Sequence, residues 1–261
     1  MPASNSKDRV TIIGIRQVPH HLSKEVFETK MGALLDAFMA LPVCKKNVLK
    51  WDLILPMPSS FDASIRAIGF SEPQSHVLAV AECETTDHWA EVFADPEWSR
   101  LVMEGEKEFN FCSSSQTFFT DVVTKIEGVE SVNPNPVRSV WILKAQSRFS
   151  RDEFSDKLGG FVDQLLAMPK AQKTFHKHVM FLPSTMDTSD RGTDTMLRGL
   201  GLPVPEPAVV LVTESKSQED VIELCADQAV KELMKEATAE LELHVNSVAF
   251  LGNLQSKGNR A

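Results

Sequence analysis

The hydrophobic and polar positions follow the same order of strand-like and helix-like patterns twice along the chain. Residues 10–18 and 137–145 are rich in β-branched and aromatic residues, which predicts strands. After each strand, apolar residues recur at helical spacing, at positions 27, 31, 34, 35 and 38 and again at 154, 158, 161, 162 and 165. Each half is therefore predicted to run strand, helix, strand, loop, strand, helix, strand.

The two halves also match residue by residue. Residues 23–56 align with residues 150–183 without a gap, and eleven of these 34 positions are identical. Residues 77–118 then align with residues 209–250, after a polar insertion in the second half. Self-similarity of this kind predicts two copies of one supersecondary unit.

Local signals place the ends of several elements. Ser150 and Glu153 fit a capping box, which begins a helix. Asp95-Pro96 interrupts the second helix of the first half, and proline then opens its continuation. The last strands are expected at residues 111–123 and 242–253.

A βαββαβ unit is the ferredoxin-like split βαβ, with both helices on one face of a four-stranded antiparallel sheet. The other sheet face needs a cover, and two units in one chain can cover each other. We therefore expect an α+β fold of two tandem ferredoxin-like units, packed sheet to sheet as an intramolecular α+β barrel. The halves are predicted at 8–125 and 137–252, with a linker at 126–136.

At this level the chain resembles the dimeric α+β barrel superfamily, in a tandem form. The pattern S-x-x-x-F-x-x-x-x-G, in residues 23–32 and 150–159, is similar to the first helix of the EthD-like branch, and so is VFADPEWSRLVMEGEKEF. The layout is similar to tandem proteins of basidiomycete fungi. The resemblance implies a barrel that acts on small molecules. The histidine expected in the first helix of the EthD-like branch is absent from both halves.

Composition narrows the classes of partner. The net charge of −9 disfavours nucleic acid and anionic membranes, because both need clustered Lys and Arg. No apolar run is long enough for a transmembrane helix, and the start lacks a signal-peptide pattern. Four widely spaced cysteines indicate reduced thiols, so a cytoplasmic protein is expected. Because the halves complete one barrel, we expect a monomer, or a homodimer through helices or edge strands.

Histidines are the main candidate catalytic groups. His176 and His178 lie two apart on a predicted strand, so both imidazoles should face one side. His244 and Asn246 are expected on one face of the last strand. If these faces look into the barrel, the four residues share one cavity, where imidazole suits proton transfer and Asn could hold an oxyanion. The alternatives are an exposed strand start or, with no clear third ligand, a metal site; we predict no metal.

Other residues are candidates for binding a substrate. Trp51, Trp141 and Phe250 could line an aromatic pocket, or could belong to the core. Arg66 and Arg198 recur in an R-x-x-G loop expected to close the mouth of a cavity, where arginine could clamp a carboxylate or anchor the loop.

These patterns lead to two competing functions. No nucleotide-binding or hydrolase motif is present, and we expect no cofactor. One hypothesis is a cofactor-free lyase, cyclase or isomerase that acts on a hydrophobic aromatic or isoprenoid molecule in fungal secondary metabolism. The other is a non-catalytic ligand-binding or stress-associated protein, which a barrel interior filled by side chains would favour. A haem or metal oxidoreductase is a third possibility.

Overall fold

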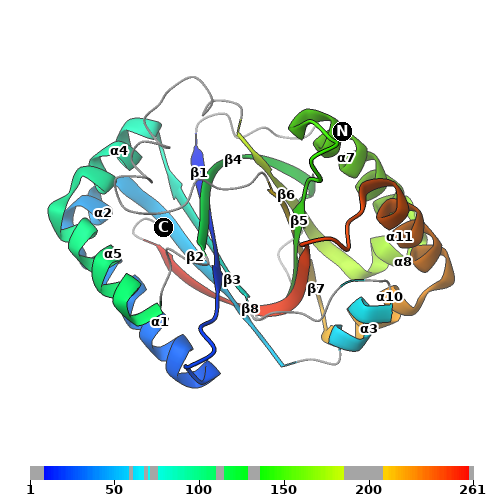
Figure 1. Ribbon diagram of the computed structural model, residues 1–261, viewed down its shortest axis with the longest axis horizontal. Coiled ribbons are helices and arrows are strands. Elements are labelled where there is room, and N and C mark those ends of the chain that lie inside the picture. The colour runs from blue at the N-terminus through cyan, green and yellow to red at the C-terminus, as the bar shows by residue number, and fades with distance from the viewer. Residues whose placement is uncertain are drawn as a thin grey trace.

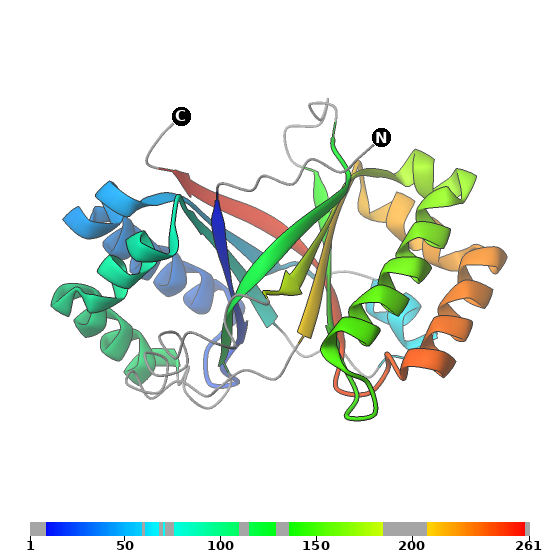
Figure 2. The ribbon, with the colours of Figure 1, turned by 90° about the horizontal axis from the view of Figure 1, so that it is seen from above.

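The computed structural model describes residues 9–58, 61–67, 70, 76–109, 115–128, 136–184 and 208–258. Eight strands form a closed barrel, and a layer of helices flanks it on each side (Figures 1 and 2). The elements of the first half are β1 (Val10–Gln17), α1 (Lys24–Ala40), α2 (Pro42–Asn47), β2 (Val48–Pro56), α3 (Phe61–Ala67), β3 (His76–Cys83), α4 (Thr86–Ala94), α5 (Pro96–Phe109) and β4 (Ser115–Ile126). Those of the second half are β5 (Val137–Lys144), α7 (Arg151–Ala167), α8 (Pro169–Thr174), β6 (Phe175–Pro183), β7 (Ala208–Ser215), α10 (Gln218–Ala226), α11 (Gln228–Leu241) and β8 (Val248–Gly258).

The strand order confirms the tandem ferredoxin-like prediction. Around the barrel the strands run β1-β3-β2-β8-β5-β7-β6-β4, so each half contributes four strands. In the first half β1 pairs with β3 and β4, and in the second half β5 pairs with β7 and β8, all antiparallel. Helices α1 and α7, each of 17 residues, begin at the equivalent caps Ser23 and Ser150. The sequence repeat is therefore a repeat of structure.

Two strand pairs between the halves close the barrel. β2 pairs with β8, and β4 pairs with β6, both antiparallel. The barrel interior is filled by apolar side chains from both halves, including the buried residues Ile13, Leu78, Val140 and Val210. Of the two alternatives that the sequence leaves open, the structure therefore has the filled barrel interior. A dimer through edge strands is wrong for the strands described, since each already has two neighbours.

The last strand begins later than its sequence pattern predicts. Glu242 and Asn246 have positive φ angles of 54° and 56°, the left-handed region typical of turns. The segment after α11 therefore forms a turn, and β8 starts at Val248. It continues to Gly258, past the predicted boundary at 252.

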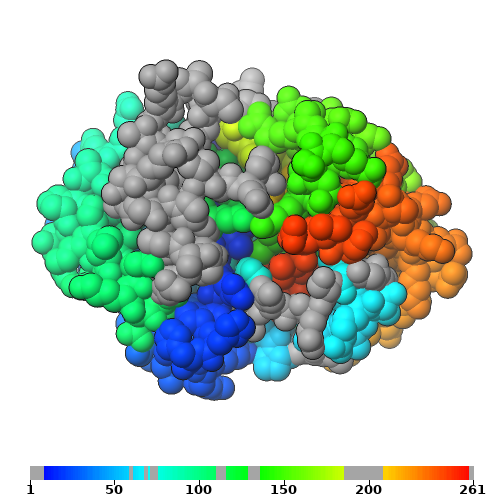
Figure 3. Space-filling view, viewed as in Figure 1, coloured from blue at the N-terminus to red at the C-terminus, as the bar shows by residue number. Residues whose placement is uncertain are grey.

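Helix α3 of the first half packs on the second half. Phe61 and Ile65 are fully buried there, and the Phe61 ring meets Trp141 edge-on with centroids 6.0 Å apart. In Figure 3 the cyan surface of this segment lies against the orange and red surface of the second half. The predicted loop thus contains a helix that ties the halves together. No helix within the described ranges is long and apolar enough to cross a bilayer.

Candidate functional site

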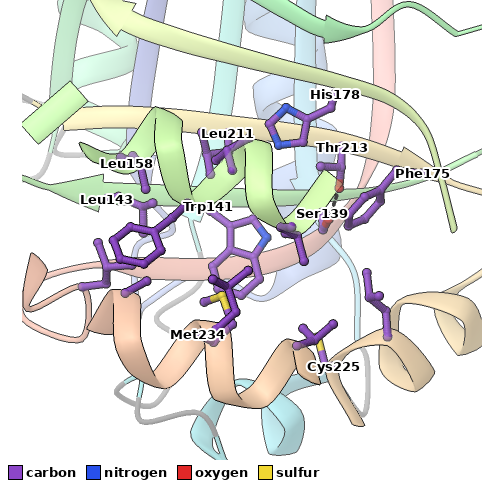
Figure 4. Close-up of a pocket in the computed structure, with 18 of the residues that line it drawn as sticks. Ser139, Trp141, Leu143, Leu158, Phe175, His178, Leu211, Thr213, Cys225 and Met234 are labelled. Atoms are coloured by element: carbon purple, nitrogen blue, oxygen red, sulfur yellow. Dashed lines mark hydrogen bonds between the residues drawn. The ribbon is translucent and has the colours of Figure 1, made fainter. Parts of the chain in front are cut away.

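A cavity lies between the sheet of the second half and helices α7, α10 and α11. We call it the second-half pocket (Figure 4). Its empty volume is about 850 Å³, including the part open to solvent. It is lined by Ser139, Trp141, Leu143, Leu158, Phe161, Val162, Leu165, Phe175, His178, Leu211, Thr213, Val221, Leu224, Cys225, Val230, Leu233, Met234, Ala237 and Leu243.

Three polar side chains form a row across the sheet side of this pocket. Ser139 on β5 is paired with Thr213 on β7, and Thr213 is paired with His178 on β6. Paired residues of antiparallel strands share a face, so all three lie on the helix-facing side. The row has an apolar counterpart in the first half, formed by Ile12, Ala81 and Trp51.

The two hydroxyl groups of the row are hydrogen-bonded to each other. Ser139 Oγ and Thr213 Oγ1 are drawn with a dashed line in Figure 4. Each hydroxyl carries one proton, and their mutual bond uses only one. The second proton can therefore be donated to an oxygen atom of a ligand.

His178 is a neutral imidazole at pH 7. The side chain is 1% exposed, and burial lowers its pKa to about 4, because the charged form would lose its hydration. Lys125 lowers this pKa further, whereas Asp163, the ion-pair partner of Lys125 at 2.7 Å, raises it. Its Nδ1 has no hydrogen-bond partner among the described residues. A neutral imidazole has one unprotonated ring nitrogen, which can accept a proton.

Leucine, valine and alanine side chains form most of the remaining wall, and its aromatic members are Trp141, Phe161 and Phe175. The ring of Phe175 meets His178 edge-on at 6.4 Å, and Phe70 meets Trp141 at 5.4 Å. Cys225 on α10 also lines the pocket, and burial raises the pKa of its thiol to about 11. The thiol is therefore protonated at neutral pH and is a poor nucleophile.

The structure does not bring the four predicted catalytic residues together. A β-bulge between Phe175 and Lys177 breaks the alternation of β6. Phe175 and His178 consequently face the pocket, while His176 is half-buried and lies outside the pocket lining. His244 and Asn246 are exposed in the turn before β8. The expectation of one cavity holding all four is wrong, because both segments depart from a regular strand.

The predicted substrate-binding residues are also dispersed. Trp141 lines the second-half pocket, Trp51 lines a separate cavity in the first half, and Phe250 lies inside the packed barrel. Arg66 is exposed in the last turn of α3. Arg198 lies outside the described residues. No group of three or more metal-ligating side chains occurs in the part of the chain that the structure describes.

Ser139 and Thr213 were not among the residues predicted from the sequence, although the comparison of the two halves contains a signal for them. The repeat aligns Ser139 with Ile12 and Thr213 with Ala81, so a polar residue replaces an apolar one twice on strands predicted to be buried. Buried hydroxyls on sheet faces are common, and only the strand pairing shows that these two adjoin His178.

Solved structures with the same fold cover nearly the whole chain. An anthrone oxidase-like protein matches with a TM-score of 0.65 and 13% identity, over 99% of this chain and 97% of its own. A candidate monooxygenase from Fusobacterium nucleatum matches with a TM-score of 0.53 and 8% identity, over 96% and 94%. No protein-family model matches the sequence, and no curated protein matches it. The chain therefore has the fold of the dimeric α+β barrel proteins, as its sequence predicted.

Proposed function

We propose that the second-half pocket binds a hydrophobic, planar aromatic molecule and that His178 removes a proton from it. The chain would then be a lyase, cyclase or isomerase that needs no cofactor for this step. The observation that carries the proposal is a neutral, buried imidazole beside a hydroxyl pair in an apolar cavity.

The polar row suits the formation of an enolate or phenolate. With the ligand oxygen at the Ser139–Thr213 pair, the spare hydroxyl proton stabilises the negative charge that develops there. His178 takes the proton while the electron pair stays on the ligand. The new anion raises the pKa of the imidazole, because opposite charges attract strongly in an apolar cavity. Return of the proton to another carbon completes an isomerisation, and loss of a leaving group completes an elimination.

The names of the structural neighbours support this substrate class. One is anthrone oxidase-like, and another is a candidate monooxygenase. An anthrone is a planar aromatic ketone with an acidic methylene group, so its reactions begin with the loss of a proton. The resemblance to the EthD-like branch and to tandem proteins of basidiomycete fungi supports a place in fungal secondary metabolism. The widely spaced cysteines favour the cytoplasm.

A non-catalytic ligand-binding protein is the second candidate. The packed barrel interior favours it, because the enzyme hypothesis from the sequence places its catalytic residues around a cavity inside the barrel. Under this alternative His178 and the hydroxyl pair would only orient a bound molecule.

Proton exchange on anthrone separates the two candidates. We expect the protein to speed deuterium uptake at the anthrone methylene in D₂O, followed by NMR. His178→Gln should lower that rate by roughly 10²–10⁴, the usual contribution of a general base. His176→Gln is the matched control, because it changes a histidine on the same strand outside the pocket lining. Binding of anthrone without faster exchange would favour the non-catalytic alternative.

A further inference from the structure

A lysine of the first half lies beside His178 of the second half. β4 pairs with β6 where the two halves join, and the pair Thr124–Val179 is followed by the pair Ile126–His178. Lys125 is therefore the extra residue of a β-bulge, and His178 has both Lys125 and Ile126 opposite it. The surroundings of the proposed base thus include residues from both halves of the chain.

An ion pair fixes the direction of this lysine. Lys125 Nζ donates to Oδ1 of Asp163 on α7 at 2.7 Å. The next residue of α7, Val162, lines the second-half pocket together with His178, so the ammonium group is held on the same side of the sheet as the imidazole. The lysine side chain is only 24% exposed, so water and salt screen its charge incompletely.

The first half contains the same arrangement next to a different ring. Lys257 on β8 pairs with Trp51, and its Nζ lies 2.7 Å from Oδ1 of Asp36 on α1. Asp36 and Asp163 occupy equivalent positions of the repeat. Each half therefore extends a lysine from its last strand to the first helix of the other half. An indole does not titrate, so of the two lysines only Lys125 stands beside a proton acceptor.

The two members of this ion pair act on His178 in opposite directions. Burial is the main cause of its low pKa. A nearby positive charge disfavours the imidazolium form, so Lys125 lowers the pKa of His178 further. The carboxylate of Asp163 raises the same pKa, because it attracts the imidazolium.

The other charged groups on the surrounding elements are exposed or paired. Among the described residues that line the pocket, Cys225 on α10 is the only titratable group besides the histidine, and its thiol is protonated at neutral pH. On α8, Lys173 is exposed and Lys170 lies 4.0 Å from the carboxylate that caps α11. On β7, Glu214 forms an ion pair with Arg138.

We propose that Lys125, held by Asp163, is a positioning residue that extends to lower pH the range in which His178 is an unprotonated base. Before a ligand binds, the ammonium group opposes the uptake of a proton from water, so the imidazole is ready to take one from the ligand. The carboxylate limits this effect. The inference rests on the proposed role of His178 as the base, and it adds that a complete site needs both halves.

Titration of the His178 ring, followed by ¹H–¹³C NMR on the full chain, tests the proposal without any turnover. Lys125→Met should raise the pKa of His178 by roughly 0.5–1 pH unit, and Asp163→Asn should lower it. Lys257→Met is the matched control, because it breaks the equivalent ion pair beside Trp51, and it should leave this pKa unchanged. His178→Gln assigns the signal.

The opposite signs separate an electrostatic role from a structural one. If the ion pair only held the halves together, either substitution would let water reach the ring, and the pKa would rise toward the ordinary 6.5 in both variants. Lys125→Arg keeps the charge and should keep the wild-type pKa. The protonated fraction at pH 5 gives the same comparison if a variant unfolds at lower pH. It should be higher than in the wild-type chain for Lys125→Met and lower for Asp163→Asn.

An unchanged pKa in Lys125→Met, or a raised pKa in Asp163→Asn, would overturn the proposal. Asp163 is exposed, so its variant remains a test if Lys125→Met folds poorly. Where the chain speeds the exchange of anthrone protons, the acid midpoint of the pH–rate profile should follow the pKa of each variant. The expected pKa changes without any exchange would support the role of Lys125 and count against the proposed reaction alone.

Discussion

At the scale of single residues, the main difference between the two halves is that His178 occupies the position of Trp51. Both side chains project from the second strand of their half toward the helices, and both line a cavity. One cavity gains a neutral base, and the other gains a ring for stacking. The same backbone therefore surrounds two cavities with different walls.

Burial of a neutral histidine makes the stability depend on pH. The pKa of His178 is about 4 in the folded chain and about 6.5 when unfolded, so between these values only the unfolded chain binds the proton. The free energy of unfolding should fall as the pH drops from 6.5 to 4, by about 2–3 kcal/mol at pH 4.5. Urea unfolding at pH 7, 5.5 and 4.5 measures this loss.

The contribution of His178 is isolated by comparing variants. His178→Gln should lose less stability over that pH range than the wild-type chain, because glutamine does not titrate. His176→Gln should keep the wild-type dependence. An identical pH slope in His178→Gln would show that the acid sensitivity arises elsewhere.

The face of His178 could not be predicted from the sequence alone. Strict alternation places His176 and His178 together, whereas the bulge at the start of β6 puts Phe175 and His178 on one side. A matching bulge occurs between Val48 and Lys50 in the first half. Such bulges depend on pairing with distant strands, so the local pattern does not reveal them.

At the scale of elements, the join between β2 and β8 is tightly packed at Gly252. A Cβ there would lie 2.6 Å from Ile54 Cγ2 and 2.8 Å from the carbonyl oxygen of Leu55. Gly252→Ala should therefore destabilise the chain by about 1–3 kcal/mol, since the opposing strand must move. Chemical denaturation measures the change.

Gly159 in α7 is the control for Gly252, because it is a glycine with free space around it. A Cβ at this position meets nothing within 4 Å, so Gly159→Ala should stabilise the helix by about 0.5–1 kcal/mol. Destabilisation at Gly159 together with a neutral effect at Gly252 would be inconsistent with the packing described.

Elements with local signals were predictable, and contacts between halves were not. Ser150 Oγ accepts from the Glu153 amide, and α5 follows directly after Asp95, as the sequence indicated. The packing of α3 on the second half and the strand pairs that close the barrel depend on residues far apart in sequence. Periodicity shows that a face is buried and does not show what covers it.

At the scale of the whole molecule, each half leaves surface that only the other covers. A fragment of residues 1–127 would expose the barrel-facing residues Ile13 and Leu78, the edges of β2 and β4, and Phe61 on α3. We expect this fragment to self-associate or aggregate when expressed alone. Mixing it with a fragment of residues 128–261 should restore a particle with the 29.0 kDa mass of the chain.

Light scattering decides this prediction. A monomeric fragment 1–127, with cooperative unfolding and the stability of the intact chain, would mean that the halves fold independently. The intact chain, whose two sheets already cover each other, serves as the reference.

Fusion of the two halves has a consequence for how the protein can change over generations. In a barrel built from two identical subunits, one codon change alters both pockets at once, so a residue useful in one is imposed on the other. Here Gly14 and Trp141 are encoded separately, as are Trp51 and His178. Each pocket can acquire or lose a side chain while its counterpart stays as it was, and the shared barrel wall keeps both in place.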